Sequence, residues 1–318
     1  MKRLEIAAIA LTAGTLFAAC PAFAQRDSQQ GQGRAIVTVL PSAKNGNAGQ
    51  ISAQSLKVKV NGKESAVTSF NQLQENNSPI ELVLLLDAGA RASLGTQFGD
   101  IQNFVKEMPP NSRMAIAYMQ QGRAAFASQL SSNPADVLKG LHLSSGIPGE
   151  NASPYFCLSD LAKNWPSHDR TARREVVMIS DGVDNYERRF DPDDPYVQTA
   201  IKDSVRAGLV VYSIYWQNTG RMNSTGYETN AGQNLLLLVT QATGGNSYWQ
   251  GLGNPVSLQP FFQDLRRRLN NQYEVSFTAP SSGKPQVESL KVDLHVPSAK
   301  VAAPQQVLVT GAVSARGE

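Results

Sequence analysis

Two aspartates stand where a sheet could bring them together. Asp87 follows the apolar run at residues 82–86, and Asp181 follows the apolar run at residues 176–179 by two positions. Continuous apolar runs of this length are typical of central strands in a parallel sheet that is covered on both faces. Ligands of open α/β sheets bind at the carboxyl ends of such strands. We therefore expect Asp87 and Asp181 to meet at one site, where their carboxylates could hold a divalent cation or contact a partner.

The segment around these aspartates alternates between strand and helix patterns. Helices are expected at residues 96–108, 134–141, 155–165, 194–207, 235–242 and 256–270. Ser153 is suited to cap the third helix, and Gly208 is suited to end the fourth. Strands separated by helices predict a mostly parallel central sheet with helices on both faces. We assign this α/β domain to residues 80–271.

The segments on either side have a period of two instead. Residues 34–79 include an alternating strand at 56–60 that is followed by Asn61-Gly62, a two-residue hairpin turn. Residues 272–318 contain further alternating runs. We expect both flanks to form one small accessory antiparallel β unit that packs against the α/β domain.

The amino terminus has the pattern of an export signal. A basic start, an apolar stretch and Ala-Phe-Ala at positions 22–24 predict a signal peptide at residues 1–24. The polar, Gly-rich residues 25–33 predict a flexible tether. The expected location is therefore the periplasm or the medium, and the alternative is a lipoprotein anchored through Cys20. Without Cys20, Cys157 is the only thiol, and its apolar setting favours a buried structural residue.

Composition argues against several classes of function. Removal of residues 1–24 leaves 27 basic and 25 acidic residues, which gives no reason to expect a nucleic-acid partner. No later apolar run is long enough to span a membrane. No Gly-x-Ser-x-Gly motif or phosphate-binding loop is present. The histidines lie in unrelated segments without metal-ligand spacing, at positions 142, 168 and 295. We therefore expect a protein that is not an enzyme.

With both aspartate motifs in view, the chain resembles the von Willebrand factor A domain. It is most similar to the VWFA-related subfamily common in exported acidobacterial proteins. The similarity rests on the order of several short pieces, at residues 56–70, 82–87, 176–185, 242–245 and 265–277. The resemblance implies a Rossmann-like core whose sheet edge is able to carry a metal-ion-dependent adhesion site for Mg²⁺.

Transfer of that metal motif onto this sequence is incomplete. The motif that the resemblance implies is Asp-x-Ser-x-Ser after the first strand, a threonine on a middle loop and an aspartate after the fourth strand. Asp87 matches the first aspartate and Asp181 the last, and Ser153 is the best match to the threonine. Gly89 and Arg91 occupy the two serine positions, so two oxygen ligands are missing, and the cation of Arg91 opposes a divalent ion. The expected site is therefore degenerate and without a cofactor, and it would contact the carboxylate or loop of a protein partner through these five residues.

Three alternatives remain at this point. In the first, Asp87, Ser153 and Asp181 still hold Mg²⁺ and the protein is a metal-dependent adhesion module. In the second, the two aspartates serve a metal-assisted hydrolase. In the third, Asp87 and Asp181 only end strands and organise turns.

Overall fold

A computed structural model describes most of the chain after the expected signal peptide. The described residues are 29–43, 49, 51–74, 76–144, 151–187, 190–218, 226–249, 251 and 253–311, and for Gln29, Arg91 and Ala92 the description covers the backbone alone. The expected signal peptide, Cys20 and residues 25–28 of the expected tether lie outside these ranges. The fold is of the mixed α/β class, with two separate sheets.

Within the described ranges, six strands form a mostly parallel sheet in the order β10-β9-β8-β5-β6-β7. Their bounds are β5 (Ile80–Asp87), β6 (Arg113–Gln120), β7 (Arg123–Phe126), β8 (Arg173–Ser180), β9 (Leu209–Tyr215) and β10 (Ser247–Tyr248). Strand β7 runs antiparallel to β6, and the other pairings are parallel. This is the strand order of a doubly wound sheet, in which the order reverses between β5 and β8.

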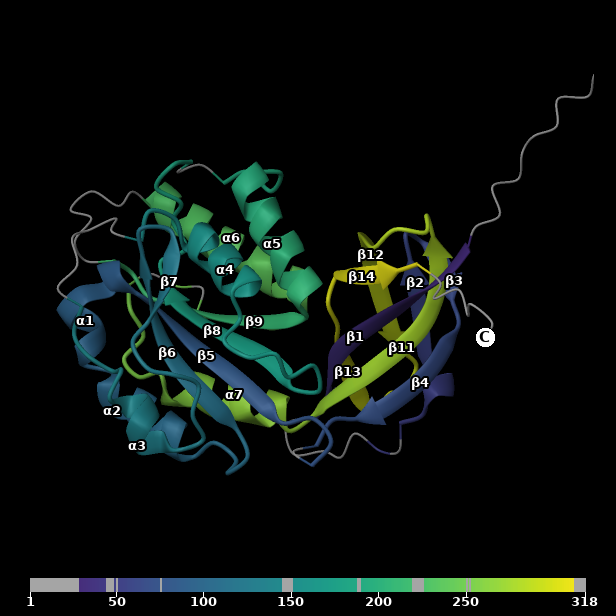
Figure 1. Ribbon diagram of the computed structural model, residues 1–318, viewed down its shortest axis with the longest axis horizontal. Coiled ribbons are helices and arrows are strands. Elements are labelled where there is room, and N and C mark those ends of the chain that lie inside the picture. The colour runs from purple at the N-terminus through teal and green to yellow at the C-terminus, as the bar shows by residue number, and fades with distance from the viewer. Residues whose placement is uncertain are drawn as a thin grey trace, which may run out of the picture.

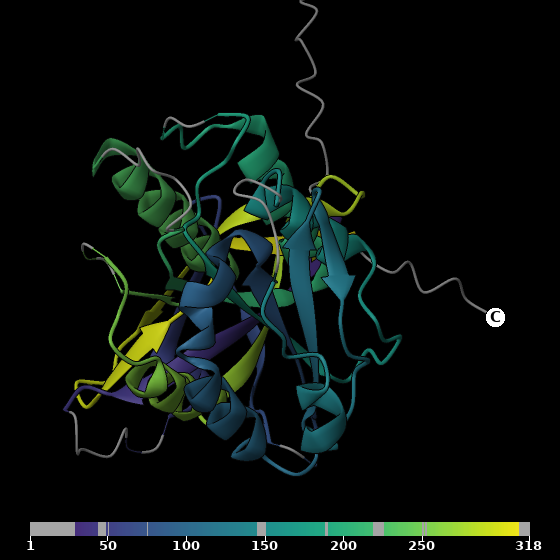
Figure 2. The same ribbon diagram turned by 90° about the vertical axis from the view of Figure 1, so that its left-hand side faces the viewer.

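Helices cover both faces of this sheet (Figures 1 and 2). Their bounds are α1 (Arg91–Gly95), α2 (Phe98–Lys106), α3 (Pro134–Leu138), α4 (Pro154–Lys163), α5 (Pro195–Ala207), α6 (Gly226–Thr243) and α7 (Gln259–Leu269). Helices α2, α3 and α7 pack on one face, and α4, α5 and α6 pack on the other. Strand β5 is buried along its whole length, as its continuous apolar run predicts.

The predicted helix ends are confirmed where the sequence carries a clear cap. The Ser153 hydroxyl accepts the backbone N–H of Tyr155 at the start of α4. Gly208 ends α5 with a φ of 71°, in the left-handed region that glycine adopts without strain. Helix α6 starts at Gly226, earlier than the expected residue 235. The sequence pattern missed its first turns because they are polar and show no apolar periodicity.

The β unit is larger than the small unit we expected. Eight strands of the described chain form one sheet, in the order β3-β2-β12-β14-β1-β11-β4 with β13 paired to β1. Their bounds are β1 (Gln29–Pro41), β2 (Leu56–Val60), β3 (Lys63–Ser65), β4 (Val67–Gln72), β11 (Gln272–Ser281), β12 (Gln286–Leu294), β13 (Ala299–Ala302) and β14 (Gln306–Thr310). Strands of the two flanks are interleaved in this sheet and share one apolar core, so each flank buries apolar side chains against the other.

The tether prediction is wrong for the part that the structure describes. Residues 29–33 form the first half of β1 and pair with β11. The glycines that suggested a mobile segment serve close packing instead. A Cβ on Gly33 would lie 2.4 Å from the Phe277 ring, and one on Gly31 would lie 2.3 Å from the Thr310 carbonyl oxygen.

The predicted Asn61-Gly62 hairpin turn is confirmed between β2 and β3, with positive φ at both residues. Strand β4, however, leaves this hairpin and pairs with β11. The residues after the turn are therefore divided between β3 and β4, which lie at different places in the sheet.

The amino ends of the parallel strands adjoin the β unit, and the carboxyl ends lie on the far side (Figure 1). Buried Arg173, at the start of β8, donates to the carbonyl oxygens of Ser78 and Leu269 and to the side chain of Gln272. Arg173 thereby links the two chain segments that connect the α/β domain to the β unit, one between β4 and β5 and the other between α7 and β11. No helix in the described ranges is long and apolar enough to cross a membrane.

Candidate functional site

Asp87 lies at the carboxyl end of β5, and it is 2% exposed. One carboxylate oxygen, Oδ1, accepts the backbone N–H of Gly89 at 2.8 Å. The other, Oδ2, accepts the Ser180 hydroxyl at 2.7 Å and the Asn151 amide at 3.0 Å. Asp87 therefore joins three segments at the switch point between β5 and β8.

The Asn151 amide has a fixed orientation. Its Nδ2 donates to Asp87, while its Oδ1 accepts the side-chain amide of Asn185 at 2.8 Å. The Asn151 carbonyl oxygen accepts the backbone N–H groups of Gly122 and Ser153. The loop before α4 is thus bound to the strand ends on both of its sides.

Ser153 contacts Asp184, which is not one of the residues that the resemblance assigns to the metal motif. Its hydroxyl donates to Asp184 Oδ2 at 3.0 Å, and Asp184 Oδ1 accepts the backbone N–H of Tyr186 at 2.8 Å. Burial raises the pKa of Asp184, and the hydrogen bonds from Tyr186 and Ser153 oppose that rise. Asp184 itself is 1% exposed, although it begins an acidic stretch of loop sequence.

Asp181 is also buried, two positions beyond the end of the β5–β8 ladder. Its Oδ1 accepts the backbone N–H of Val183 at 3.0 Å, which closes the turn after β8. Gly182 has a φ of 66°, and a Cβ on Gly232 of α6 would lie 2.1 Å from the Asp181 carbonyl oxygen. The backbone of the turn thus packs directly on α6, and there is no space for a side chain at position 232.

Gly89 and Arg91 lie in the turn after β5. Gly89 is buried, and a Cβ there would lie 2.3 Å from Nδ2 of the buried Asn218. Gly89 therefore lets the turn approach the segment that follows β9. Arg91 begins α1, and its side chain lies outside the described residues.

The side chains around Asp87 do not fit a Mg²⁺ ion in this arrangement. Mg²⁺ needs oxygen lone pairs in octahedral geometry, but Asp87 faces an amide N–H, a hydroxyl and a backbone N–H. Among the described residues, no three His, Cys, Asp or Glu side chains are grouped to hold a metal ion. A cation that bound Oδ2 of Asp87 would have to displace the Asn151 and Ser180 hydrogen bonds.

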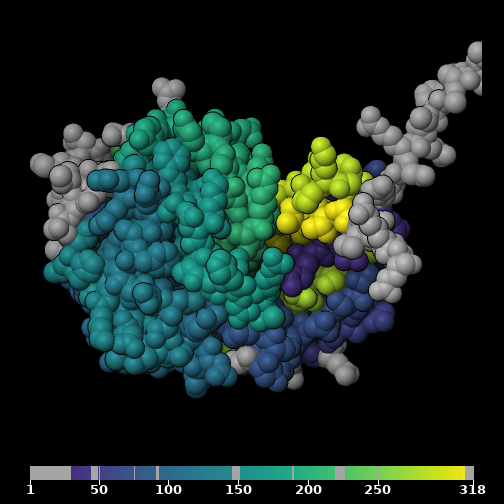
Figure 3. All heavy atoms as spheres, in the orientation of Figure 1, coloured from purple at the N-terminus to yellow at the C-terminus, as the bar shows by residue number. Residues whose placement is uncertain are grey.

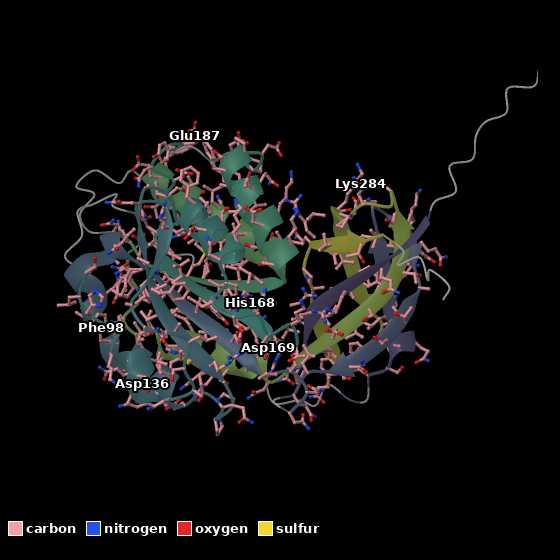
Figure 4. The ribbon with its side chains drawn as sticks, in the orientation of Figure 1. Phe98, Asp136, His168, Asp169, Glu187 and Lys284 are labelled. Carbon is pink, nitrogen blue, oxygen red and sulfur yellow. The ribbon has the colours of Figure 1, made fainter. Side chains whose placement is uncertain are left out.

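The outer surface of this edge carries aromatic side chains. Phe156 of α4, Tyr186 after β8 and Tyr196 of α5 have ring centroids 4.9 to 6.5 Å apart. Tyr186 is 67% exposed and Tyr196 is 47% exposed. We call these three residues the aromatic group. Glu187, adjacent to Tyr186, lies at the outer margin of the α/β domain in Figure 4.

The thiol of Cys157 lies near this edge, in a setting that disfavours the reactive thiolate. Cys157 is buried, and burial raises the pKa of its thiol. Its Sγ donates to the carbonyl oxygen of Asn151 at 3.4 Å. The interpretation of Cys157 as a buried structural residue fits this environment.

The residues that organise the site are partly those that the sequence suggested. Asp87, Asp181 and Ser153 all lie buried at the predicted edge of the sheet. We missed Asn151 and Ser180, which bind Asp87 directly. Ser180 directly precedes Asp181, and Asn151 lies two positions before Ser153. Both side chains can donate a hydrogen bond to a carboxylate.

Comparisons with known proteins give distant structural similarity alone. No protein-family model and no curated protein matches the chain. The chain is similar to an aerotolerance-related membrane protein from Bacteroides fragilis, with 13% identity, a TM-score of 0.44, and coverage of 60% of this chain and 98% of that one. It is also similar to VWA2, an ArnB paralogue from Sulfolobus acidocaldarius, with 11% identity, a TM-score of 0.41, and coverage of 87% and 76%. At these values neither a family nor a function is assigned.

Proposed function

We propose that this chain is an exported, non-catalytic protein-interaction module of the von Willebrand factor A type, with a metal site that has lost its ion. The doubly wound strand order and the sequence resemblance support the fold assignment. The contact surface is the carboxyl edge, where Asp87 and Asp181 end neighbouring strands. The expected partner is a protein, which engages this edge through a loop or a carboxylate.

One observation carries this proposal. The carboxylates of the edge are buried and hydrogen-bonded inward, whereas Tyr186, in the loop after β8, and Tyr196, in the first turn of α5, are exposed. Catalysis by Asp87 would require an accessible oxygen, but the oxygens of Asp87 accept neutral donors from three segments. Exposed tyrosines on a rigid support are typical of the central contacts in protein interfaces.

The aromatic group is anchored to the buried network on two sides. Tyr186 donates its backbone N–H to Asp184, which accepts the Ser153 hydroxyl. Phe156 lies in the first turn of α4, three residues after the Ser153 cap. A partner would therefore bind a preorganised surface and would lose little side-chain freedom in ordering it.

The test is capture of a partner from envelope extract by the immobilised chain, with EDTA in one arm and Mg²⁺ in the other. We expect the same partner to be captured in both arms by the wild type. The variant Tyr186→Ser/Tyr196→Ser should lose it. The variant Phe126→Ser/Val256→Ser removes two exposed apolar side chains outside the aromatic group, and it should retain the partner.

Capture that requires Mg²⁺ would favour the metal-dependent alternative. Equal capture by both double variants would place the contact surface elsewhere and contradict the proposal.

A further inference from the structure

A cleft of about 520 Å³ lies between the α/β domain and the β unit. Its walls come from the end of α5 and the segment before β8 on one side, and from β1, β4, β11 and β14 on the other. Figure 3 shows the surface hollowed between the two parts of the molecule. In Figure 4, His168 and Asp169 of the segment before β8 lie on the side that faces the β unit. The cleft is thus at the amino ends of the strands, opposite the aromatic group.

Four arginines line this cleft, and no aspartate or glutamate is among its lining residues. They are Arg34, Arg170, Arg174 and Arg206, and we call the space the arginine cleft. A guanidinium keeps its charge at any physiological pH. Four such charges around one cavity repel each other unless an anion offsets them.

The neighbouring carboxylates offset this charge only in part. Arg34 pairs with Glu274 at 3.2 Å. Arg206 lies 3.9 Å from Asp203, which is held more closely by Lys163 at 2.9 Å. Both arginine side chains remain more than half exposed, so these pairs are weak.

The other two arginines have no carboxylate partner within the described chain. Arg174 donates to the carbonyl oxygens of Ala207 and Ser167, which leaves its charge in place while fixing its side chain. Arg170 is exposed, and no ion pair or hydrogen bond holds its guanidinium among the described residues. A fixed and a free guanidinium therefore share the cavity with two weakly paired ones.

The remaining wall of the arginine cleft is of two kinds. Hydroxyl groups are supplied by Thr68, Ser276 and Thr310, and apolar surface is supplied by Ile36, Val205, Phe277 and Leu308. The volume lies in the usual range for a small-molecule site. Guanidinium groups bind carboxylate and phosphate oxygens in the same forked geometry.

We propose that the arginine cleft binds a small organic anion that carries at least two carboxylate or phosphate groups. The acidic groups contact the arginines, and the carbon skeleton lies against the apolar wall. Because the wall belongs to both parts of the chain, the bound anion joins the α/β domain to the β unit. This site is separate from the proposed partner surface.

The test is isothermal titration calorimetry of the full chain with citrate, pyrophosphate and neutral sorbitol at physiological ionic strength. We expect saturable binding of at least one anion and none of sorbitol. The variant Arg170→Gln/Arg206→Gln should weaken that binding by roughly tenfold or more, since it removes two charge-assisted contacts. The control Lys106→Gln/Arg123→Gln removes two exposed charges elsewhere, and binding should stay within about twofold.

The two anions distinguish the source of the acidic groups. Binding of citrate alone indicates a polycarboxylate, binding of pyrophosphate alone indicates a phosphate ester, and binding of both indicates recognition by charge. Absence of binding for both anions up to about 10 mM overturns the proposal. Equal affinity in the two double variants, or binding of polyglutamate without either small anion, also overturns it.

Discussion

Asn151 donates its side-chain amide to Asp87 at 3.0 Å, across 64 positions of the sequence. The bond joins the loop before α4 to the carboxyl end of β5, and the Asn185 amide fixes its direction. A neutral side-chain donor thus contacts the aspartate that the resemblance assigns to the metal motif. This relationship links the resemblance to the proposed metal-free function.

Removal of the Asn151 amide should destabilise the protein. In Asn151→Ala, the buried carboxylate of Asp87 loses one of its donors, and an unsatisfied buried charged group costs about 1–3 kcal/mol or more. Urea unfolding measures the change in the free energy of unfolding. Asn164→Ala removes an exposed amide that bonds Asp160 at 2.9 Å, and it should have a much smaller effect. Equal decreases in the free energy of unfolding would show that the hydrogen bond to Asp87 stabilises the protein no more than the exposed one does.

A methyl group at Gly89 should be poorly tolerated. The added Cβ would lie 2.3 Å from Nδ2 of Asn218, so buried atoms must shift, at about 1–3 kcal/mol. Gly99, in the first turn of α2, has no atom within 4 Å of the same position, and Gly99→Ala should stabilise the helix by about 0.5–1 kcal/mol. The melting temperature should therefore fall in Gly89→Ala and rise in Gly99→Ala. A higher melting temperature for Gly89→Ala than for the wild type would contradict this account of the turn.

Glu175 should make stability depend on pH. It is fully buried in β8, and burial raises its pKa to about 7 from 4.5, against the opposing effects of Arg173 and Gln272. Its Oε2 has no hydrogen-bond partner among the described residues. Because the folded-state pKa is the higher one, the full stability is present below about pH 4.5 and is lost as pH rises through about 7. The free energy of unfolding above pH 7 should be lower than that below pH 4.5 by about 3 kcal/mol.

The variant Glu175→Gln tests this assignment through urea unfolding at a series of pH values. It carries no titrating group at this position, so the decline between about pH 4.5 and 7 should shrink. The variant should also be more stable than the wild type at pH 8. A decline that persists unchanged in Glu175→Gln would assign it to another group.

Sequence patterns predicted the elements that depend on local chemistry. The fully buried β5, the Ser153 cap, the Asn61-Gly62 turn and the Gly208 helix end each follow from a few adjacent residues. The extent of the β unit did not follow, because its strands pair across the whole chain. Gly31 and Gly33 show the difference, since their role in close packing depends on β11 and β14.

The candidate site was predictable in position but not in its connections. Strand ends predicted where Asp87 and Asp181 lie, because parallel strands end at a common edge. Which side chain bonds which depends on loop conformation. Ser153 reaches Asp184, and Asn151 reaches Asp87, because Ala152 between them has a φ of 59°. An L-residue rarely adopts that conformation, so the pattern of residue types could not indicate it.

The most direct test of the metal-free edge is calorimetric unfolding of EDTA-stripped protein with and without millimolar Mg²⁺ or Mn²⁺. An ion that binds the folded state alone must raise the melting temperature. We expect the unfolding transition to stay where it is, because Asn151 and Ser180 occupy the Asp87 carboxylate. A rise that Asp87→Asn abolishes would place a metal ion at this carboxylate and contradict the account.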